Sequence, residues 1–380
     1  MARPGKSRMW SNQRILGFVI SILLLCQMVI FWTCQAKANL LPTATLPSSS
    51  SLLEYGEMVR QDALTGCRML TDEDLKDNLP LQFYCQRRSR LHPSFSSEAA
   101  VRAWQHVRHR CNISEDAVMS ILRKSRSYTS EKLSITLWST GKDEGAEFVL
   151  REGVGDLYHL KEQGSRAAAG LALDLGSNLG AVTIQLSRLH PQWTIVAVEA
   201  MPITFLYQVV NLWLNVRHEM QRGVIVPTLH ALSSVDGATV TMQFREDSTT
   251  SSRDWNPDSE DWRTTLNVSI QTISLPSLLH DVFPAILKFP PIDLLKIDCE
   301  GCEYDVIPAL SEEHISSISH AVAETHYDGM LKNGRAGPPV SQVERTHQRL
   351  CQQWSVCIDA VSGKNYDPPY RPSATLLQKL

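Results

Sequence analysis

Five residues around two neighbouring apolar runs could together hold a nucleotide-like ligand. Asp174 and Glu199 each close one of the runs, and Gly176, Asn178 and Gly180 follow Asp174. Glycines at this spacing allow a tight turn after a strand, and an acidic residue ending the next strand can accept hydrogen bonds from both hydroxyls of a ribose. The third glycine of the dinucleotide fingerprint G-x-G-x-x-G is missing. The spacing therefore favours an adenosyl ligand other than a dinucleotide.

A second polar group follows a later apolar run and could act on an acceptor. Lys296, Asp298 and Glu300 alternate by two, so they share one face if the strand extends through them. Asp298 is the first candidate for orienting or deprotonating an acceptor, with Glu300 beside it. A lysine two residues earlier stabilises the charged aspartate and weakens it as a base. His326 is therefore a further candidate, because imidazole titrates near neutral pH, although an ordinary surface histidine explains it equally well.

Metal or redox chemistry is a weaker interpretation of the same region. These carboxylates, together with Glu324 and His326, could hold a divalent ion, but oxygen-rich spacing alone is not specific, and we predict no metal site. The pair Cys299-x-x-Cys302 has no second C-x-x-C or Cys/His pair to complete a zinc site. We interpret it as two partly buried thiols beside a turn. Nine cysteines are present, and their spacing leaves the disulfide connectivity open.

These residues need a scaffold that brings them together, and the pattern after residue 166 predicts one. Short apolar runs alternate with helical stretches, as in a parallel sheet covered by helices. Ligands bind at the carboxyl ends of the strands in such sheets, so the carboxylates should converge on one cleft. We expect strands at 171–175, 194–198, 224–229, 292–297 and 320–323, and helices at 179–189, 203–216, 276–282 and 304–310. Residues 356–358 and 375–377 are expected to form a closing antiparallel pair at the sheet edge.

Three motifs in this region resemble those of the FkbM family of S-adenosylmethionine-dependent methyltransferases. They are Asp174-x-Gly176-x-Asn178-x-Gly180, Glu199-x-x-Pro202 and Lys296-Ile297-Asp298-Cys299-Glu300-Gly301-Cys302-Glu303. The resemblance spans about residues 166–330 and implies an α/β fold over residues 166–380, a Rossmann-like class I methyltransferase sheet that is mostly parallel with an antiparallel edge strand. It also implies S-adenosyl-L-methionine as the cofactor and O-methylation as the reaction. The cofactor-binding residues that it implies are Asp174, Gly176, Asn178, Gly180, Glu199 and Ala231.

The N-terminal part of the chain carries a different signal, an apolar run of membrane-spanning length. Residues 15–33 predict a signal anchor after a basic cytoplasmic tail, residues 1–14, and the positive-inside rule places the rest of the chain in a lumen. A cleaved signal peptide is the alternative, because Ala36-Lys37-Ala38 suits signal peptidase. Residues 34–51 predict a Ser/Pro/Thr stem. Residues 52–165 predict a small, mainly helical accessory region without a recognisable catalytic motif.

Two glycosylation sequons, Asn112-Ile113-Ser114 and Asn267-Val268-Ser269, agree weakly with a lumenal body. The composition, with 43% hydrophobic residues in 380, is that of a globular protein, and a formal net charge of -3 gives no general attraction to nucleic acid. We therefore expect a type II membrane protein of the Golgi or another secretory lumen that O-methylates a hydroxyl of a glycan, a small molecule or a secreted acceptor. An NAD(P)-dependent sugar-modifying oxidoreductase and a non-catalytic lumenal binding protein are the alternatives.

Overall fold

The computed structural model describes the chain over residues 78–80, 82, 115–141, 143–155, 158, 160, 169–221, 225–245, 248–253, 266–283, 289–324, 339–353, 356–359 and 374–378. The chain divides into the units Met1–Ala63 and Leu64–Leu380, and every described residue belongs to the second. The predicted tail, anchor and stem, much of the accessory region and His326 lie outside the described residues. Among the helices that are described, none has the length and apolarity needed to cross a membrane.

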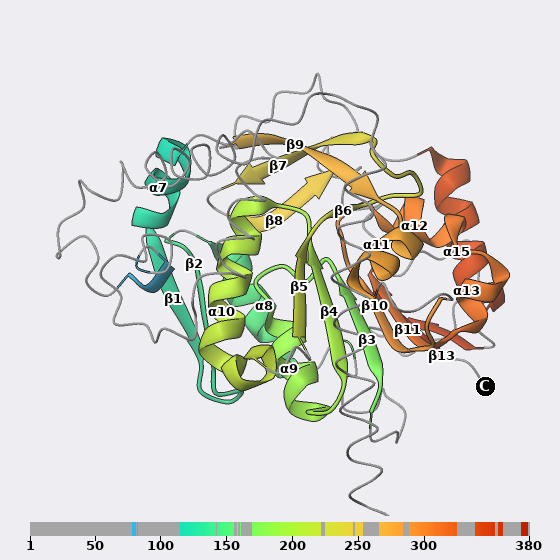
Figure 1. Ribbon diagram of the computed structural model, residues 1–380, viewed down its shortest axis with the longest axis horizontal. Coiled ribbons are helices and arrows are strands. Elements are labelled where there is room, and N and C mark those ends of the chain that lie inside the picture. Colours follow the sequence, from blue (N-terminus) through green and yellow to red (C-terminus); the bar gives the residue numbers. More distant parts are fainter. Residues whose placement is uncertain are drawn as a thin grey trace, which may run out of the picture. The chain divides into compact units, whose positions relative to one another are not determined.

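A mostly parallel sheet organises the described residues, as the strand pattern predicts (Figure 1). In these residues, seven strands follow the order β12-β13-β11-β10-β3-β4-β5. Strand pairs β11/β10, β10/β3, β3/β4 and β4/β5 are all parallel, which confirms the predicted sheet. The bounds are β3 Leu171–Leu175, β4 Thr194–Glu199, β5 Ile225–Leu229, β10 Ile292–Ile297, β11 Ile318–Glu324, β12 Val356–Asp359 and β13 Ala374–Gln378.

The closing strands form the predicted antiparallel pair, but the antiparallel strand is not the edge strand itself. Strand β13 runs antiparallel to both β11 and β12, so it lies one place in from the edge. Helix α15 (Val340–Gln353) lies between β11 and β12 in sequence, and β12 does not pair with β11 but lies one strand position further out. Strand β13 occupies the position between β11 and β12 and pairs with both of them.

Helices cover both faces of the sheet because the central strands carry apolar residues on both sides. In β3, Leu171, Leu173 and Leu175 share a core with helices α11 (Leu275–Val282) and α12 (Glu303–Ala309). Ala172 faces the other way and packs with α9 (Ala181–Leu189). Such double burial explains why the strand is an almost continuous apolar run. It also makes Asp174, the polar residue of β3, a buried group that requires partners.

Local signals set the helix starts. Helix α9 begins after Gly180, and α11 begins after Ser274, whose hydroxyl accepts the Ser277 backbone N–H. Helix α10 (Pro202–Gln221) begins with a proline, which has no N–H to leave unpaired, and is interrupted at Val216 (φ −142°). The short helix α13 is Glu312–Ser316.

A second sheet lies between β5 and α11 in sequence, where the apolar pattern predicts no strands. It has the order β6-β9-β7-β8, with bounds β6 Ala231–Leu232, β7 Thr239–Arg245, β8 Ser248–Arg253 and β9 Leu266–Ile273. Strand β9 alternates buried and exposed side chains, which is typical of a sheet with one solvated face.

The described part of the accessory region contains a hairpin as well as helices. Helices α7 (Glu115–Arg123) and α8 (Glu144–Gly155) flank strands β1 (Ser125–Ser130) and β2 (Ile135–Thr140). Two asparagine side chains of α10 hydrogen-bond to the backbone of β2. Asn211 accepts the Trp138 N–H at 2.6 Å and donates to the Trp138 carbonyl at 3.1 Å, and Asn215 makes the same two bonds with Thr136. This region thus packs directly on α10 and shares its apolar core (Figure 1).

Candidate functional site

The glycine turn after β3 is shaped by close contact with the chain that follows β10. Gly176 and Gly180 have φ values of 76° and 88°, in the left-handed region that favours glycine. A Cβ on Gly176 would lie 1.8 Å from the carbonyl oxygen of Asp298 and 2.8 Å from Cα of Cys299. The turn is also joined to β4, since the N–H groups of Gly176 and Ser177 both donate to the Val198 carbonyl. Gly176 is therefore required because only a residue without a side chain lets this turn pack against the backbone of Asp298 and Cys299.

Glu199, the predicted ribose-binding acid, is joined to the same turn. One carboxylate oxygen accepts the Asn178 N–H at 2.9 Å, and the other accepts the Met201 N–H at 2.8 Å. The side chain is buried, and burial raises the pKa of Glu199 to about 7, against the backbone hydrogen bonds from Met201 and Asn178, which lower it. The structure thus brings two predicted cofactor-binding residues, Glu199 and Asn178, into direct contact.

The side chain of Asn178 provides a hydrogen-bond acceptor in the glycine turn, next to Glu199. Its own φ is 49°, which asparagine tolerates better than most residues. Its side-chain Oδ1 is buried and accepts no hydrogen bond from the described part of the chain. A buried acceptor of this kind suits a ligand that carries N–H or O–H donors.

Lys296 lies at the centre of the site and is almost completely buried. Its Nζ donates to the Gly176 carbonyl at 2.8 Å and forms ion pairs with Asp174 at 3.3 Å and Asp298 at 3.2 Å. Burial lowers the pKa of Lys296, but the charges of Asp298 and Asp174 outweigh it and hold the pKa above its usual value. One ammonium group therefore connects the glycine turn, β3 and the end of β10.

Asp174 lies beneath the turn, with no exposed surface. Its carboxylate accepts the Thr183 hydroxyl at 2.6 Å and faces Lys296. This position is suited to holding Lys296 and α9 in place. The predicted contact of Asp174 with a cofactor stays a prediction, because the contacts seen here are those that support the turn.

Tyr158 is a site residue that the sequence did not reveal. Its hydroxyl donates to Asp298 at 2.7 Å and lies 3.1 Å from a carboxylate oxygen of Glu324, and its ring lies 5.4 Å from Nζ of Lys296. The tyrosine precedes β3 in a segment without a periodic pattern, so no local signal identified it. It brings the carboxylates at the ends of β10 and β11 together, as the sheet topology predicted for Asp298 and Glu324.

The remaining predicted residues surround this centre. Ala231 is buried in β6, one residue after His230, whose backbone N–H donates to the Glu199 carbonyl at 3.0 Å. Glu300 occupies the turn after β10 with φ 52°. Glu303 is fully buried and accepts the Gly301 N–H at 2.8 Å.

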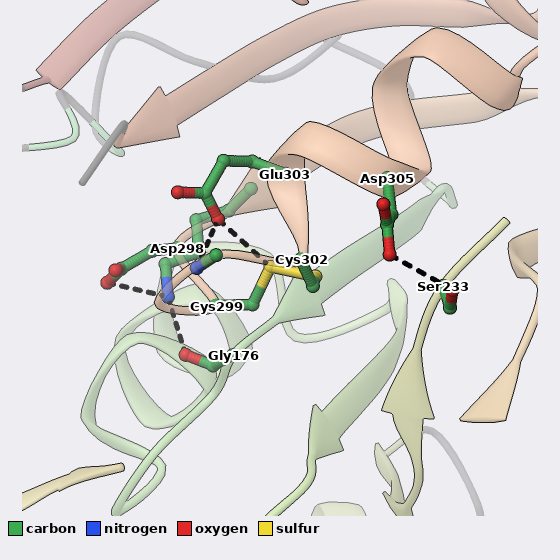
Figure 2. Close-up of a disulfide and its surroundings, with 9 residues drawn as sticks. Gly176, Ser233, Asp298, Cys299, Cys302, Glu303 and Asp305 are labelled. Carbon is green, nitrogen blue, oxygen red and sulfur yellow. Dashed lines mark hydrogen bonds and ion pairs between the residues drawn. A yellow bond between two sulfur atoms is a disulfide. The ribbon is translucent and has the colours of Figure 1, made fainter. Parts of the chain in front are cut away.

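Cys299 and Cys302 form a disulfide, which corrects our interpretation of them as two free thiols (Figure 2). The turn between β10 and α12 reverses the chain, so that the two Cα atoms lie 5.4 Å apart, within the range that a disulfide requires. Carbonyl and carboxylate groups of Gly176, Asp298 and Glu303 lie around it. Among the described residues, no group of three or more His, Cys, Asp or Glu side chains is arranged to hold a metal ion.

Comparison with known proteins supports the resemblance drawn from the motifs. Residues 174–333 match the model of the Methyltransferase FkbM domain. "Methyltransferase 1" of Beauveria bassiana (strain ARSEF 2860) is 31% identical over 166 residues, which are 40% of this chain and 63% of that protein. "Methyltransferase sdnD" of Sordaria araneosa is 24% identical over 195 residues, 47% of this chain and 74% of that protein. The match thus spans less than two thirds of the first relative.

Solved structures show a more distant likeness. The crystal structure of the methyltransferase FkbM from Methylobacillus flagellatus KT aligns with a TM-score of 0.32 and 12% identity, over 74% of this chain and 59% of that chain. A TM-score of this size carries no argument about the site. The fold assignment therefore stands on the strand order and the family match.

Proposed function

We propose, from the match of residues 174–333 to the Methyltransferase FkbM domain, that the chain is an S-adenosylmethionine-dependent methyltransferase acting on a hydroxyl. The acceptor that we propose is a glycan or another lumenal or secreted molecule. The observation that carries the proposal is the convergence of the glycine turn, Glu199 and the Lys296–Asp298 pair at the carboxyl ends of adjacent parallel strands.

The residues at this edge fit an adenosyl ligand. When bound, S-adenosyl-L-methionine supplies an electrophilic methyl group. Glu199 would hold the ribose, because a carboxylate has about four acceptor sites and the backbone N–H groups of Asn178, Met201 and Ala200 do not use them all. Asn178 would accept from a donor of the ligand through its buried Oδ1. The family match agrees with the predicted cofactor.

The acceptor side of the site is acidic. Asp298 is partly exposed, with 23% of its side chain accessible, and the Tyr158 hydroxyl joins it to Glu324. A hydroxyl acceptor must lose a proton during methylation, and a carboxylate can orient the hydroxyl and receive that proton. Because Lys296 already neutralises Asp298, Glu324 is the second carboxylate able to take this role. His326, outside the described residues, stays a prediction.

Calorimetry tests the cofactor assignment. We expect the full-length protein to bind S-adenosyl-L-methionine and S-adenosylhomocysteine with micromolar affinity and NAD not measurably. Transfer of a labelled methyl group to a glycan panel should then fall at least tenfold in Asp298→Asn, since general-base contributions reach about 10²–10⁴. The exposed Asp281→Asn variant is the control. Binding of NAD alone would exclude the proposed function, and undiminished transfer in both Asp298→Asn and His326→Ala would exclude the site assignment.

The pKa of Glu199 predicts opposite pH trends for folding and binding. Its folded-state pKa of about 7 lies above the unfolded value of 4.5, so its contribution to stability is complete below 4.5 and is lost as pH rises through 7. Between pH 5.5 and 7.5, this residue should lower the free energy of unfolding by on the order of 2 kcal/mol. Affinity for S-adenosyl-L-methionine should rise over the same range, because ribose hydroxyls donate to the ionised carboxylate.

Denaturation and calorimetry at both pH values measure these trends, with Glu199→Gln as the comparison. The glutamine variant has a lower baseline stability, because its amide NH₂ faces a backbone N–H, so the informative quantity is the pH slope. Equal slopes in the two proteins would rule out Glu199 as the titrating group.

A lumenal location, reached through an N-terminal anchor, belongs to the same proposal. Two features of the structure support it. The Cys299–Cys302 disulfide suits an oxidising compartment, and the sequon residue Asn267 is exposed on β9, where a glycan could be attached. Protease treatment of intact microsomes should leave residues 52–380 protected, and their digestion without detergent would contradict the placement.

A further inference from the structure

The disulfide occupies a particular place in the motif that follows β10. In the pattern Lys-Ile-Asp-x-Glu-Gly-x-Glu, the two open positions are Cys299 and Cys302, and the bond between them encloses only two residues. The proposed methyl transfer uses neither sulfur atom. The bond begins at the residue directly after Asp298 (Figure 2).

The backbone that carries the disulfide supports the glycine turn. Cα of Cys299 and the carbonyl of Asp298 occupy the space that a side chain at residue 176 would need. The Asp298 N–H donates to the carbonyl of Leu175, the last residue of β3, at 2.9 Å. Any displacement of residues 298–299 therefore moves the surface against which the turn packs.

The two enclosed residues have conformations that need support. Glu300 has φ 52° and Gly301 has φ 119°. A left-handed conformation in a residue other than glycine costs about 1 to 3 kcal/mol and persists where the surrounding structure holds it. Here a covalent bond closes the turn around both residues.

A buried carboxyl group completes the arrangement. Glu303 has no exposed surface, accepts the Gly301 N–H at 2.8 Å, and places the same oxygen 3.6 Å from Sγ of Cys299. In the disulfide, this sulfur has no proton to donate. After reduction, the Cys299 thiol could donate to Glu303 and compete with the Gly301 N–H, which would loosen the turn.

We propose that Cys299–Cys302 is a thiol–disulfide exchange site whose oxidation state sets the affinity of the adjacent turn for S-adenosyl-L-methionine. The effect on the cofactor rests on the proposed function. The reaction partner is a dithiol reductant. Its thiolate attacks Sγ of Cys299, since Cys299 is the less buried residue of the pair and Cys302 is only 8% exposed. The S–S bond breaks, and Cys302 leaves as a thiolate that takes up a proton.

The second thiol of the reductant then completes the exchange. It attacks the mixed disulfide, forms the oxidised reductant and releases Cys299, which is also protonated. Two electrons and two protons thus pass from the reductant to the protein. Re-oxidation by a disulfide of suitable potential reverses the reaction.

The test compares the affinity of the full-length protein for S-adenosyl-L-methionine in buffers of graded dithiothreitol redox ratio. Alkylation and mass spectrometry measure how much of the Cys299–Cys302 bond is reduced at each ratio. We expect the affinity to fall about tenfold, within the 5- to 150-fold range common for coupled sites. The fall should follow reduction of this bond, and an affinity independent of its reduction would overturn the proposal.

Other cysteines in the chain can also be reduced, so a variant isolates this pair. Cys299→Ser/Cys302→Ser should bind like the reduced protein and show no further loss with dithiothreitol. Wild-type affinity in this variant would also overturn the proposal. If the variant does not fold, the redox titration of the natural protein decides alone.

Hydrogen exchange separates failure of this inference from failure of the proposed function. Backbone amides of residues 176–180 should exchange faster once the bond is reduced, whether or not the protein binds the cofactor. Oxidised protein that binds no S-adenosyl-L-methionine refutes the function. Unchanged exchange after reduction refutes the coupling between the disulfide and the turn.

Discussion

Lys296→Met should lower the free energy of unfolding by about 3 to 5 kcal/mol, the usual cost of removing one partner from a buried ion pair. The variant leaves Asp174, which has no exposed surface, without its 3.3 Å counter-ion, and Asp298 without its 3.2 Å partner. It also removes the donor to the Gly176 carbonyl. Urea denaturation measures the loss of stability, and calorimetry should show loss of S-adenosyl-L-methionine binding.

Two further variants test whether the loss of stability in Lys296→Met comes from the buried charge of Asp174 that is left without its counter-ion. Lys296→Met/Asp174→Asn removes the buried negative charge along with the lysine, and should recover part of the stability. Arg188→Met removes an exposed cation that donates to the Leu133 and Ser134 carbonyls, and should cost about 1 kcal/mol or less. A loss in Lys296→Met no larger than that in Arg188→Met would contradict the central role of Lys296.

Gly176→Ala should be comparably damaging, with a loss of about 4 kcal/mol or more, in the range reached only by severe substitutions. Two penalties combine at this position. The left-handed conformation at φ 76° disfavours any side chain, and a Cβ would overlap the backbone of Asp298, which cannot move aside like the end of a flexible side chain. Urea denaturation measures the loss, and cofactor binding should disappear in any protein that remains folded.

The chain provides matched glycines that separate the two penalties. Gly237 has φ 73°, but nothing lies within 4 Å of the Cβ position, so Gly237→Ala should show the conformational cost alone, about 1 to 2 kcal/mol. Gly180→Ala should fall between them, because its nearest neighbour is the end of the Leu212 side chain at 3.3 Å. Equal losses at residues 176 and 237 would disprove the overlap with Asp298.

Several features were predictable because they depend on residues close together in sequence. The apolar runs identified the main parallel strands, and the acidic residues that end them predicted the edge of the sheet at which a ligand would bind. Glu199 lies at the predicted place, next to the glycine turn. Doubly buried strands have a distinct composition, and parallel strands align their carboxyl ends, so this much follows from local pattern and topology.

Other features had no local signal because each depends on contacts between distant segments. Tyr158 reaches Asp298 across 140 positions of sequence, and the small sheet from Ala231 to Ile273 depends on pairing between strands that are separated in sequence. The spacing of Cys299 and Cys302 is compatible with two thiols or with a disulfide. The conformation of the turn between β10 and α12, which places the two cysteines close together, decides for the disulfide.

The sequence by itself therefore determined the type of fold, and it predicted the chemical class of the ligand and the edge of the sheet where the proposed site residues meet. Only the tertiary structure decided how the charges are used. From the sequence, Lys296 was expected only to lie beside Asp298. In the fold it also forms an ion pair with Asp174 and donates a hydrogen bond to the Gly176 carbonyl. The physical reason is that alternation along a strand indicates which face a side chain occupies, whereas its partners come from neighbouring strands and loops whose positions depend on the whole fold.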